Sequence, residues 1–161
     1  VGILGHNART DAYLYAQMLH MGYSYNAELA SQKDLFIKMN GRRLYMYALD
    51  NVPKAIKAGL DKLGLHISQI KKVLIHQANG KMDDAILKRL YELYDIDEAP
   101  EDVMPMTISK LGNSSVATLP TLYDYIINNQ LEGHELNSGD LVVFASVGAG
   151  MSINSFVYKM P

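Results

Sequence analysis

The sequence predicts an α/β layered domain, and two observations support that prediction. Short apolar segments alternate with longer segments whose apolar residues recur every three or four positions, as in amphipathic helices. The chain also closes with two apolar segments joined by "GAGMS", which is typical of an antiparallel strand pair. Its 161 residues are enough for one domain with a hydrophobic core.

The helices are predicted from apolar spacing together with residues that begin or end helices. Over residues 43–63, Pro53 is expected to cause a kink or a restart, and Gly64 suits the helix end. Over residues 82–93, Asp83 falls in the first turn, where the helix dipole favours an acidic side chain. The remaining elements are a helix over 114–126 with Ser114 as N-cap, strands at 1–4, 35–39, 72–76, 141–147 and 153–158, an extended segment at 103–108, and a largely irregular stretch at 7–33.

Composition excludes several classes of function. The net charge of −2 provides no overall attraction to nucleic acid or to an anionic membrane. No apolar run approaches the roughly 18 residues of a membrane-spanning helix. There is no Cys for a disulfide framework, and the five His residues show no metal-ligand spacing. We therefore expect a cytoplasmic protein with no metal site and no nucleic-acid or membrane partner. Because the sequence lacks an initiator Met and opens within an apolar strand, it is expected to be part of a longer chain.

Three loops carry the residues that are candidates for chemistry. His76 to Asn79 follow one expected strand, Gly148 to Gly150 follow another, and Gly112 to Ser115 lead into the third helix. In open α/β sheets, ligands bind at the carboxyl ends of the strands. If these loops lie at the same edge of the sheet, one site there contains an imidazole, a carboxamide and a glycine-rich backbone.

Each loop also has a simpler interpretation. A His at a strand end can be a structural hydrogen-bonding residue, "GNSS" has the composition of a helix-capping turn, and "GAG" between strands can be a tight hairpin. The sequence lacks the phosphate-binding patterns G-x-x-x-x-G-K-[ST] and G-x-G-x-x-G. It also lacks the G-x-S-x-G pattern of serine hydrolases. A phosphate loop and a Ser-His-Asp hydrolase are therefore not favoured.

Taken in order, four motifs resemble a known family. They are "KMNGRR" (38–43), "HQAN" (76–79), "GNSS" (112–115) and "LVVFASVGAGMSINSFVY" (141–158). This set resembles the C-terminal half of a beta-ketoacyl-acyl-carrier-protein synthase III, a condensing enzyme of the thiolase superfamily. The resemblance implies a thiolase-like half, a mixed β-sheet covered by helices, which is one of two similar halves in the full enzyme. Residues 34–161 would form this C-terminal domain, and residues 1–33 the end of the N-terminal half with a connecting region.

The resemblance also implies a division of catalytic labour between the two halves. A Cys in the first half takes an acyl group from a coenzyme A thioester. His76 and Asn113 would then donate hydrogen bonds to the enolate that forms when malonyl-acyl carrier protein loses carbon dioxide. A backbone N–H near Ala149 would serve the thioester carbonyl, and Ala replaces the Gly that the family usually has there. No cofactor is implied beyond the coenzyme A and carrier-protein thioesters.

Binding roles follow from the same resemblance. Lys81 would meet the acidic acyl carrier protein, although a solvated lysine at a helix start is an equally simple interpretation. The implied partners are acyl carrier protein, acyl-CoA, the N-terminal half of the same enzyme and a second copy in a homodimer. The other implied positions are Asn79 at the pantetheine arm, Gly41 and Arg42 at the mouth of the site, and Tyr45 and Met82 along the tunnel.

Two departures from the family pattern leave alternatives open. The chain contains no Cys, so it lacks the nucleophile, and Val147 stands where the family often has a bulky aromatic residue. This half is therefore predicted to be inactive alone. The chain could instead be a non-catalytic half that serves dimerisation or carrier docking. It could also belong to another branch of condensing enzymes, making a specialised lipid or polyketide, or be related to hydroxymethylglutaryl-CoA synthase.

Overall fold

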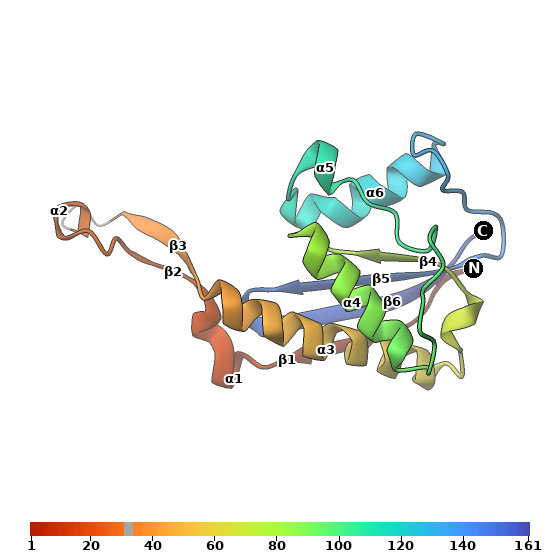
Figure 1. Ribbon diagram of the computed structural model, residues 1–161, viewed down its shortest axis with the longest axis horizontal. Coiled ribbons are helices and arrows are strands. Elements are labelled where there is room, and N and C mark those ends of the chain that lie inside the picture. Colours follow the sequence, from red (N-terminus) through yellow and green to blue (C-terminus); the bar gives the residue numbers. More distant parts are fainter. Residues whose placement is uncertain (31–33) are drawn as a thin grey trace.

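The computed structural model describes residues 1–30 and 34–161, and its main body is a mixed sheet between helices. Helices α3 and α4 cover one face of this four-stranded sheet and α6 covers the other (Figure 1). This confirms the predicted layered α/β class. In sheet order the strands are β1 (Gly2–Thr10), β6 (Ser152–Lys159), β5 (Leu141–Gly148) and β4 (Ile70–Ile75), and the covering helices are α3 (Gly41–Lys62), α4 (Gly80–Glu92) and α6 (Thr118–Ile127).

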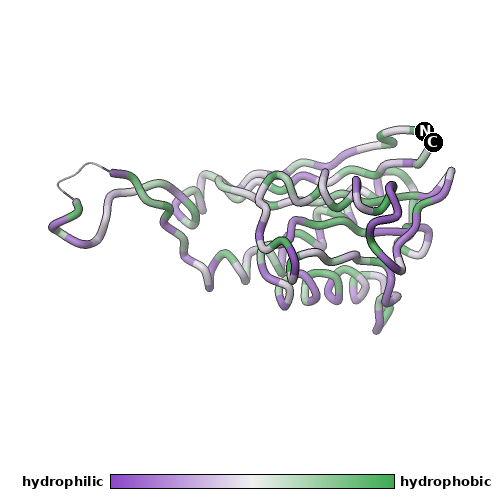
Figure 2. Tube along the Cα trace, turned by 90° about the horizontal axis from the view of Figure 1, so that it is seen from above, coloured by the Kyte–Doolittle hydropathy of each residue, from purple (hydrophilic) through white to green (hydrophobic). Residues whose placement is uncertain are grey.

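The strand directions place two strand ends side by side. β4 and β5 are parallel, with Ile75 opposite Ala145, so both strands end at the same edge of the sheet. β5 and β6 are antiparallel and joined by a tight turn between Gly148 and Ser152, as predicted. The edge where β4 and β5 end lies away from the two chain termini, which are close together in both views (Figures 1 and 2).

The two faces of the sheet are buried by alternate residues of each strand. On β4, Val73 and Ile75 join the core formed with α3 and α4, whereas Leu74 joins a second cluster with Leu122 and Ile126 of α6. Because both faces are covered, the last three residues of β4, Val73 to Ile75, are all apolar rather than alternating with polar ones. This burial fixes the end of β4, and therefore the start of the loop that begins at His76.

The first 33 residues contain more structure than the sequence predicts. β1 continues past Leu4 to Thr10 and pairs with β6, from Gly2 opposite Lys159 to Thr10 opposite Ser152. The polar half of this edge strand is stabilised by the hydrogen-bond ladder rather than by apolar burial, which explains why hydrophobic patterning misses it. The division of the chain between residues 33 and 34 stays a prediction, and residues 31–33 lie outside the described ranges.

Of the two outcomes expected at Pro53, the restart does not occur, and the cap expected at Ser114 needs correction. α3 runs without a restart through Pro53, and its N-cap is Asn40, whose side chain accepts from the Arg43 N–H. Ser114 makes no capping hydrogen bond, because a 3-10 turn (Ser115–Ala117) separates it from α6. Pro120 falls in the first turn of α6, where a missing N–H is tolerated.

A two-stranded arm extends from the body beside the start of α3. Its strands β2 (Leu19–Tyr23) and β3 (Leu35–Met39) are antiparallel, and β3 has the predicted bounds. Figure 1 shows the arm reaching away from the sheet, and Figure 2 shows hydrophobic stretches along it. The remaining short helices are α1 (Ala12–Tyr15), α2 (Ala27–Ala30) and α5 (Ile108–Leu111), and exposed apolar residues of the arm include Met21, Tyr23, Tyr25, Leu35, Phe36, Ile37 and Met39.

Candidate active site

His76 lies directly after β4, at the edge of the sheet where β5 also ends. Its backbone N–H donates to the Ala145 carbonyl at 3.0 Å, which extends the parallel ladder by one residue and fixes where the side chain begins. The imidazole is half-buried, and burial lowers its pKa, while a hydrogen bond to the Ser115 backbone acts in the opposite direction. The ring is therefore neutral near pH 7 and can donate a hydrogen bond without acting as a strong acid.

Asn113 is held on the turn between α5 and α6. Its Oδ1 accepts from the Ser115 N–H at 2.9 Å, and Ser115 adopts a left-handed φ of 54°. This local bond fixes which end of the amide faces the backbone. Within the described ranges, Nδ2 has no hydrogen-bond partner, so a donor is left for a ligand. The structure therefore brings the Asn113 turn to His76 through their shared neighbour, Ser115.

The loop between β5 and β6 carries Ala149, the expected source of the second backbone donor. It forms a 3-10 turn over Ala149–Met151. Gly150 has a φ of 73° and Met151 a φ of 48°, whereas Ala149 stays outside the positive-φ region. For a non-glycine residue such as Met151, the left-handed conformation costs roughly 1–2 kcal/mol. Ala149 therefore avoids the cost that a left-handed φ would impose on a non-glycine residue.

Gln77 is a supporting residue that the sequence analysis did not single out. Its side chain is 1% exposed, and it spans the gap to the segment before α5. Nε2 donates to the Pro105 carbonyl at 2.9 Å, and Oε1 accepts from the Thr107 N–H at 2.9 Å. A buried carboxamide with both ends satisfied is a rigid link. It links the His76 loop to the segment that leads to Asn113. The one sequence feature that could have identified Gln77 is its position directly after His76.

The binding residues predicted on α4 occupy different environments. Asn79 is the N-cap of α4, because its Oδ1 accepts from the Met82 N–H at 3.3 Å. Its amide therefore serves the helix as well as any ligand. Lys81 is exposed on the first turn, as carrier-protein contact would require. Met82 is buried in the core, and Asp83 lies in the first turn of α4, as predicted, with its side chain fully buried.

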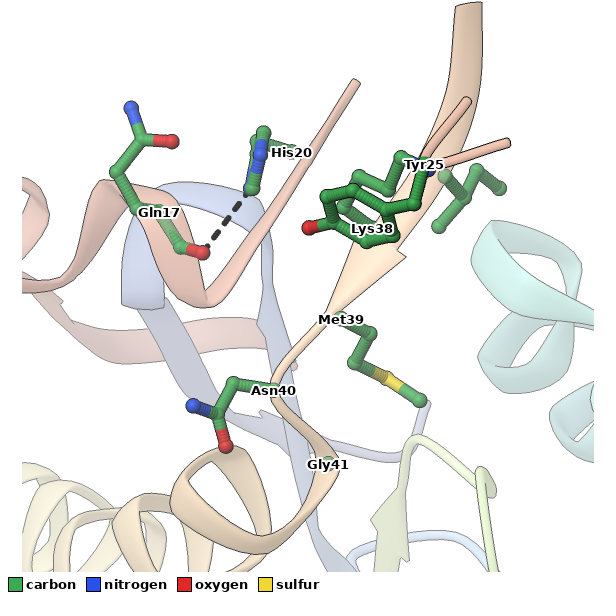
Figure 3. Close-up of a pocket in the computed structure, with 8 residues that line it drawn as sticks. Gln17, His20, Tyr25, Lys38, Met39, Asn40 and Gly41 are labelled. Carbon is green, nitrogen blue, oxygen red and sulfur yellow. Dashed lines mark hydrogen bonds between the residues drawn. The ribbon is translucent and has the colours of Figure 1, made fainter. Parts of the chain in front are cut away.

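Gly41 lies in the wall of a cavity of about 610 Å³ where the arm joins α3. Figure 3 shows its polar lining, which includes His20, Tyr25 and Lys38. The Lys38 ammonium lies 4.0 Å from the centre of the Tyr25 ring, and His20 Nδ1 lies 3.0 Å from the Gln17 carbonyl oxygen. The cavity is thus lined by an ammonium group, an imidazole and an aromatic ring, beside the bare backbone of Gly41.

The two remaining predicted binding residues lie further along α3. Arg42 is exposed and borders a separate cavity of about 340 Å³, which Tyr47 also lines. Tyr45 is half-buried and packs against the core shared with α4. The sequence analysis placed Gly41 and Arg42 at the mouth of the site and Tyr45 along the tunnel. All three lie at the start of α3, in different surroundings.

The mixed sheet covered by helices is a thiolase-like fold. The chain belongs to the beta-ketoacyl-acyl-carrier-protein synthase III family. Residues 60–160 match the family described as 3-oxoacyl-[acyl-carrier-protein (ACP)] synthase III C terminal.

Similar proteins agree with this assignment, and a similar structure agrees with the fold. The chain is 34% identical over 160 residues to the beta-ketoacyl-[acyl-carrier-protein] synthase III of Gloeobacter violaceus, covering 94% of this chain and 44% of that protein. It is 33% identical over 118 residues to that of Latilactobacillus sakei, covering 73% and 33%. The 3-oxoacyl-(acyl carrier protein) synthase III of Pseudomonas aeruginosa superposes with a TM-score of 0.78 at 20% identity, covering 99% of this chain and 44% of that one. The chain therefore spans less than half the length of these relatives.

The described residues contain neither a helix that could span a membrane nor a cluster that could hold a metal ion. Every helix in the described ranges is too short or too polar to cross a lipid bilayer. Residues 1–30 and 34–161 also contain no cluster of three or more His, Cys, Asp or Glu side chains arranged to hold a metal ion.

Proposed function

We propose that this chain is the C-terminal part of a 3-oxoacyl-acyl-carrier-protein synthase III that starts fatty acid synthesis. The observation that supports the proposal best is the pairing of a neutral, half-buried His76 with an Asn113 whose amide donor is free. Two neutral donors at one edge suit an enolate oxygen, because they stabilise developing negative charge without protonating the carbon.

The proposed reaction has two steps that use different donors. First, a Cys thiolate attacks an acyl-CoA thioester, and coenzyme A leaves as its thiolate, which takes a proton from solvent. The carbonyl oxygen is stabilised meanwhile by the Ala149 N–H. Second, malonyl-acyl carrier protein loses carbon dioxide, and the enolate oxygen accepts from His76 and Asn113. The enolate carbon then attacks the acyl-Cys thioester, which forms the new carbon–carbon bond and releases the Cys.

The nucleophilic Cys belongs to a segment outside these 161 residues, which contain none. We place it in an N-terminal half of similar architecture, at a strand-to-helix turn where a helix N-terminus lowers the thiol pKa. Acyl-CoA, malonyl-acyl carrier protein and a second copy of the enzyme are the proposed partners, in the cytoplasm. The reaction needs no cofactor beyond the two thioesters.

A second candidate function rests on the absence of Cys from the chain. Without an N-terminal half that supplies the thiol, this unit would serve only as a docking or dimerisation module. A specialised lipid or polyketide pathway is the remaining alternative. The priming β-ketosynthase of the R1128 polyketide pathway has the same fold, with a TM-score of 0.77 at 23% identity, and that likeness concerns the fold alone.

Two preparations test the proposal together. The 161-residue chain and the complete gene product are each supplied with acetyl-CoA and malonyl-acyl carrier protein, and 3-oxoacyl product is measured. We expect product from the complete protein and none from the chain alone. Product from the chain alone would refute the split site. A complete gene product that contains no Cys, or that makes no product, would favour the docking module.

A further inference from the structure

The loop between β5 and β6 is anchored by residues from outside the loop. The Met151 carbonyl accepts from the Tyr47 hydroxyl at 3.0 Å and from the Asp11 N–H at 3.2 Å. The neighbouring Gly150 carbonyl accepts from the Thr10 hydroxyl at 3.3 Å. Two consecutive carbonyls are therefore held by donors from α3 and from the end of β1.

Tyr47, one of these three donors, belongs to the hydrophobic core. It is 6% exposed, and its ring makes an edge contact with Tyr15 at a centroid distance of 5.6 Å. Its hydroxyl also lies 2.6 Å from Asp11 Oδ2, and Asp11 in turn accepts from Arg9 Nε at 2.9 Å. The phenolic oxygen thus sits between a carboxylate and the loop carbonyl.

The protonation states in this group are fixed near neutral pH. Burial and then the Asp11 carboxylate raise the pKa of Tyr47, so its hydroxyl keeps its proton. Hydrogen bonds from Tyr47 and then from Arg9 lower the pKa of Asp11, so its carboxyl group is ionised. The phenol is therefore always a donor, shared between the Asp11 carboxylate and the Met151 carbonyl.

The loop needs such an anchor because its backbone is strained. Met151 has a left-handed φ of 48° although it is not glycine, and its side chain is fully buried. Conformations of this kind persist only where surrounding contacts determine them. Both ends of the loop are fixed by the pairing of Gly148 with Ser152. Because peptide groups are planar, anchoring the two carbonyls leaves little freedom for the remaining peptide groups of the turn.

We call the loop of residues 148–152, which carries the Ala149 N–H, the oxyanion loop. We propose that Tyr47 is a positioning residue for this loop. Its hydroxyl, which also contacts Asp11, holds the Met151 carbonyl and thereby directs the Ala149 N–H. The inference rests on the proposed function of that N–H toward a thioester carbonyl. It assigns Tyr47 to acyl transfer and not to decarboxylation, because His76 and Asn113 come from different loops.

The first test measures the loop in the 161-residue chain. Tyr47→Phe keeps the ring and removes the hydroxyl, and amide hydrogen exchange is followed across residues 148–152. We expect exchange there to rise roughly tenfold, the effect of losing one well-placed hydrogen bond. Tyr94→Phe is the matched control, because Tyr94 has a buried hydroxyl without a partner in the described residues. Unchanged exchange in Tyr47→Phe would overturn the anchoring role.

The second test measures both half-reactions in the complete gene product. In Tyr47→Phe, kcat for acyl transfer from acetyl-CoA should fall about 10–100-fold, while KM for acetyl-CoA and malonyl decarboxylation stay unchanged. An equal loss in both half-reactions, or a loosened loop with unchanged acyl transfer, would overturn the positioning role. If the unsubstituted protein shows no acyl transfer, the proposed function fails and the catalytic part of this inference fails with it. The exchange measurement still decides the anchoring role.

Discussion

The buried ammonium of Lys72 on β4 is paired with Asp102. Lys72 is 1% exposed, its Nζ lies 3.1 Å from Asp102 Oδ2, and it also contacts the Asp102 carbonyl and His134 Nδ1. Lys72 lowers the pKa of the Asp102 carboxyl group. One lysine therefore links three separate segments at the end of β4 opposite His76.

This arrangement predicts a non-additive pair of substitutions. Asp102→Asn should lower the free energy of unfolding by about 1–3 kcal/mol, because a buried ammonium loses its counter-ion. Lys72→Met should cost less, since an apolar side chain of similar length fills the site. The double variant should resemble Lys72→Met alone. Denaturant unfolding of all four proteins measures the coupling, and simple additivity would show that the two charges do not interact.

Asp83 predicts a pH dependence of stability. It is 0% exposed, and neither carboxylate oxygen makes a well-formed hydrogen bond within the described ranges; the Asn79 backbone only weakly opposes the effect of burial on its pKa. Burial, with a contribution from Asp84, raises its pKa to about 7. The folded state therefore holds this proton more tightly than the unfolded chain, and stability falls as the pH rises from about 4 to about 7.

The comparison with Asp83→Asn isolates this effect from other carboxylates. Relative to the variant, the natural chain should lose roughly 2–4 kcal/mol of unfolding free energy across that pH range. Asp84→Asn, an exposed neighbour, is the control and should leave most of the slope in place. Parallel stability curves for the natural chain and Asp83→Asn would contradict the prediction.

The proposed donors predict a selective loss in the complete protein. His76→Ala or Asn113→Ala should lower malonyl decarboxylation by about 10²–10³-fold and leave acyl transfer from coenzyme A largely intact. Because burial lowers the pKa of His76, the decarboxylation rate should hold as the pH falls through about 6.5 and decline only below that value. Equal damage to both half-reactions would assign these residues to structure.

Lys81 predicts a salt-dependent step in carrier docking. Lys81→Glu should raise KM for malonyl-acyl carrier protein, more strongly at low ionic strength, and leave KM for a small malonyl thioester unchanged. Lys159→Glu makes the same charge change on an exposed residue at the far end of β6 and serves as the control. If both variants behave alike, Lys81 contributes only to overall charge.

The fold was predictable where burial imposes a period on the sequence. The strand at 35–39 and the helix from Met82 follow from apolar spacing, and their bounds agree closely with β3 and α4. The second half of β1 was missed because an edge strand with polar residues has no such period. Ser114 was misread as a cap because the left-handed turn at Ser115 depends on its bond to Asn113.

The site was predictable only in the residues that motifs mark. His76 directly follows a predicted strand, so its place is known once that strand is known. Asn113 lies between two helical segments and is marked only by its motif. Tyr47 looks like an ordinary core residue of a helix, and its role depends on Met151, more than a hundred positions away. Gln77 likewise depends on Thr107. Contacts of this range leave no periodic signal in the sequence.

The pairing of β1 with β6 also determines the order in which the molecule can fold. Gly2 pairs with Lys159, so the pairing of β1 with β6 cannot be completed until nearly all of these residues have left the ribosome. Contacts of such long sequence separation slow folding, because chain entropy is lost before they form. The Tyr47, Asp11 and Met151 contacts form with the same late step. A chain shortened within β6 would therefore lose the anchor of the oxyanion loop together with the centre of its sheet.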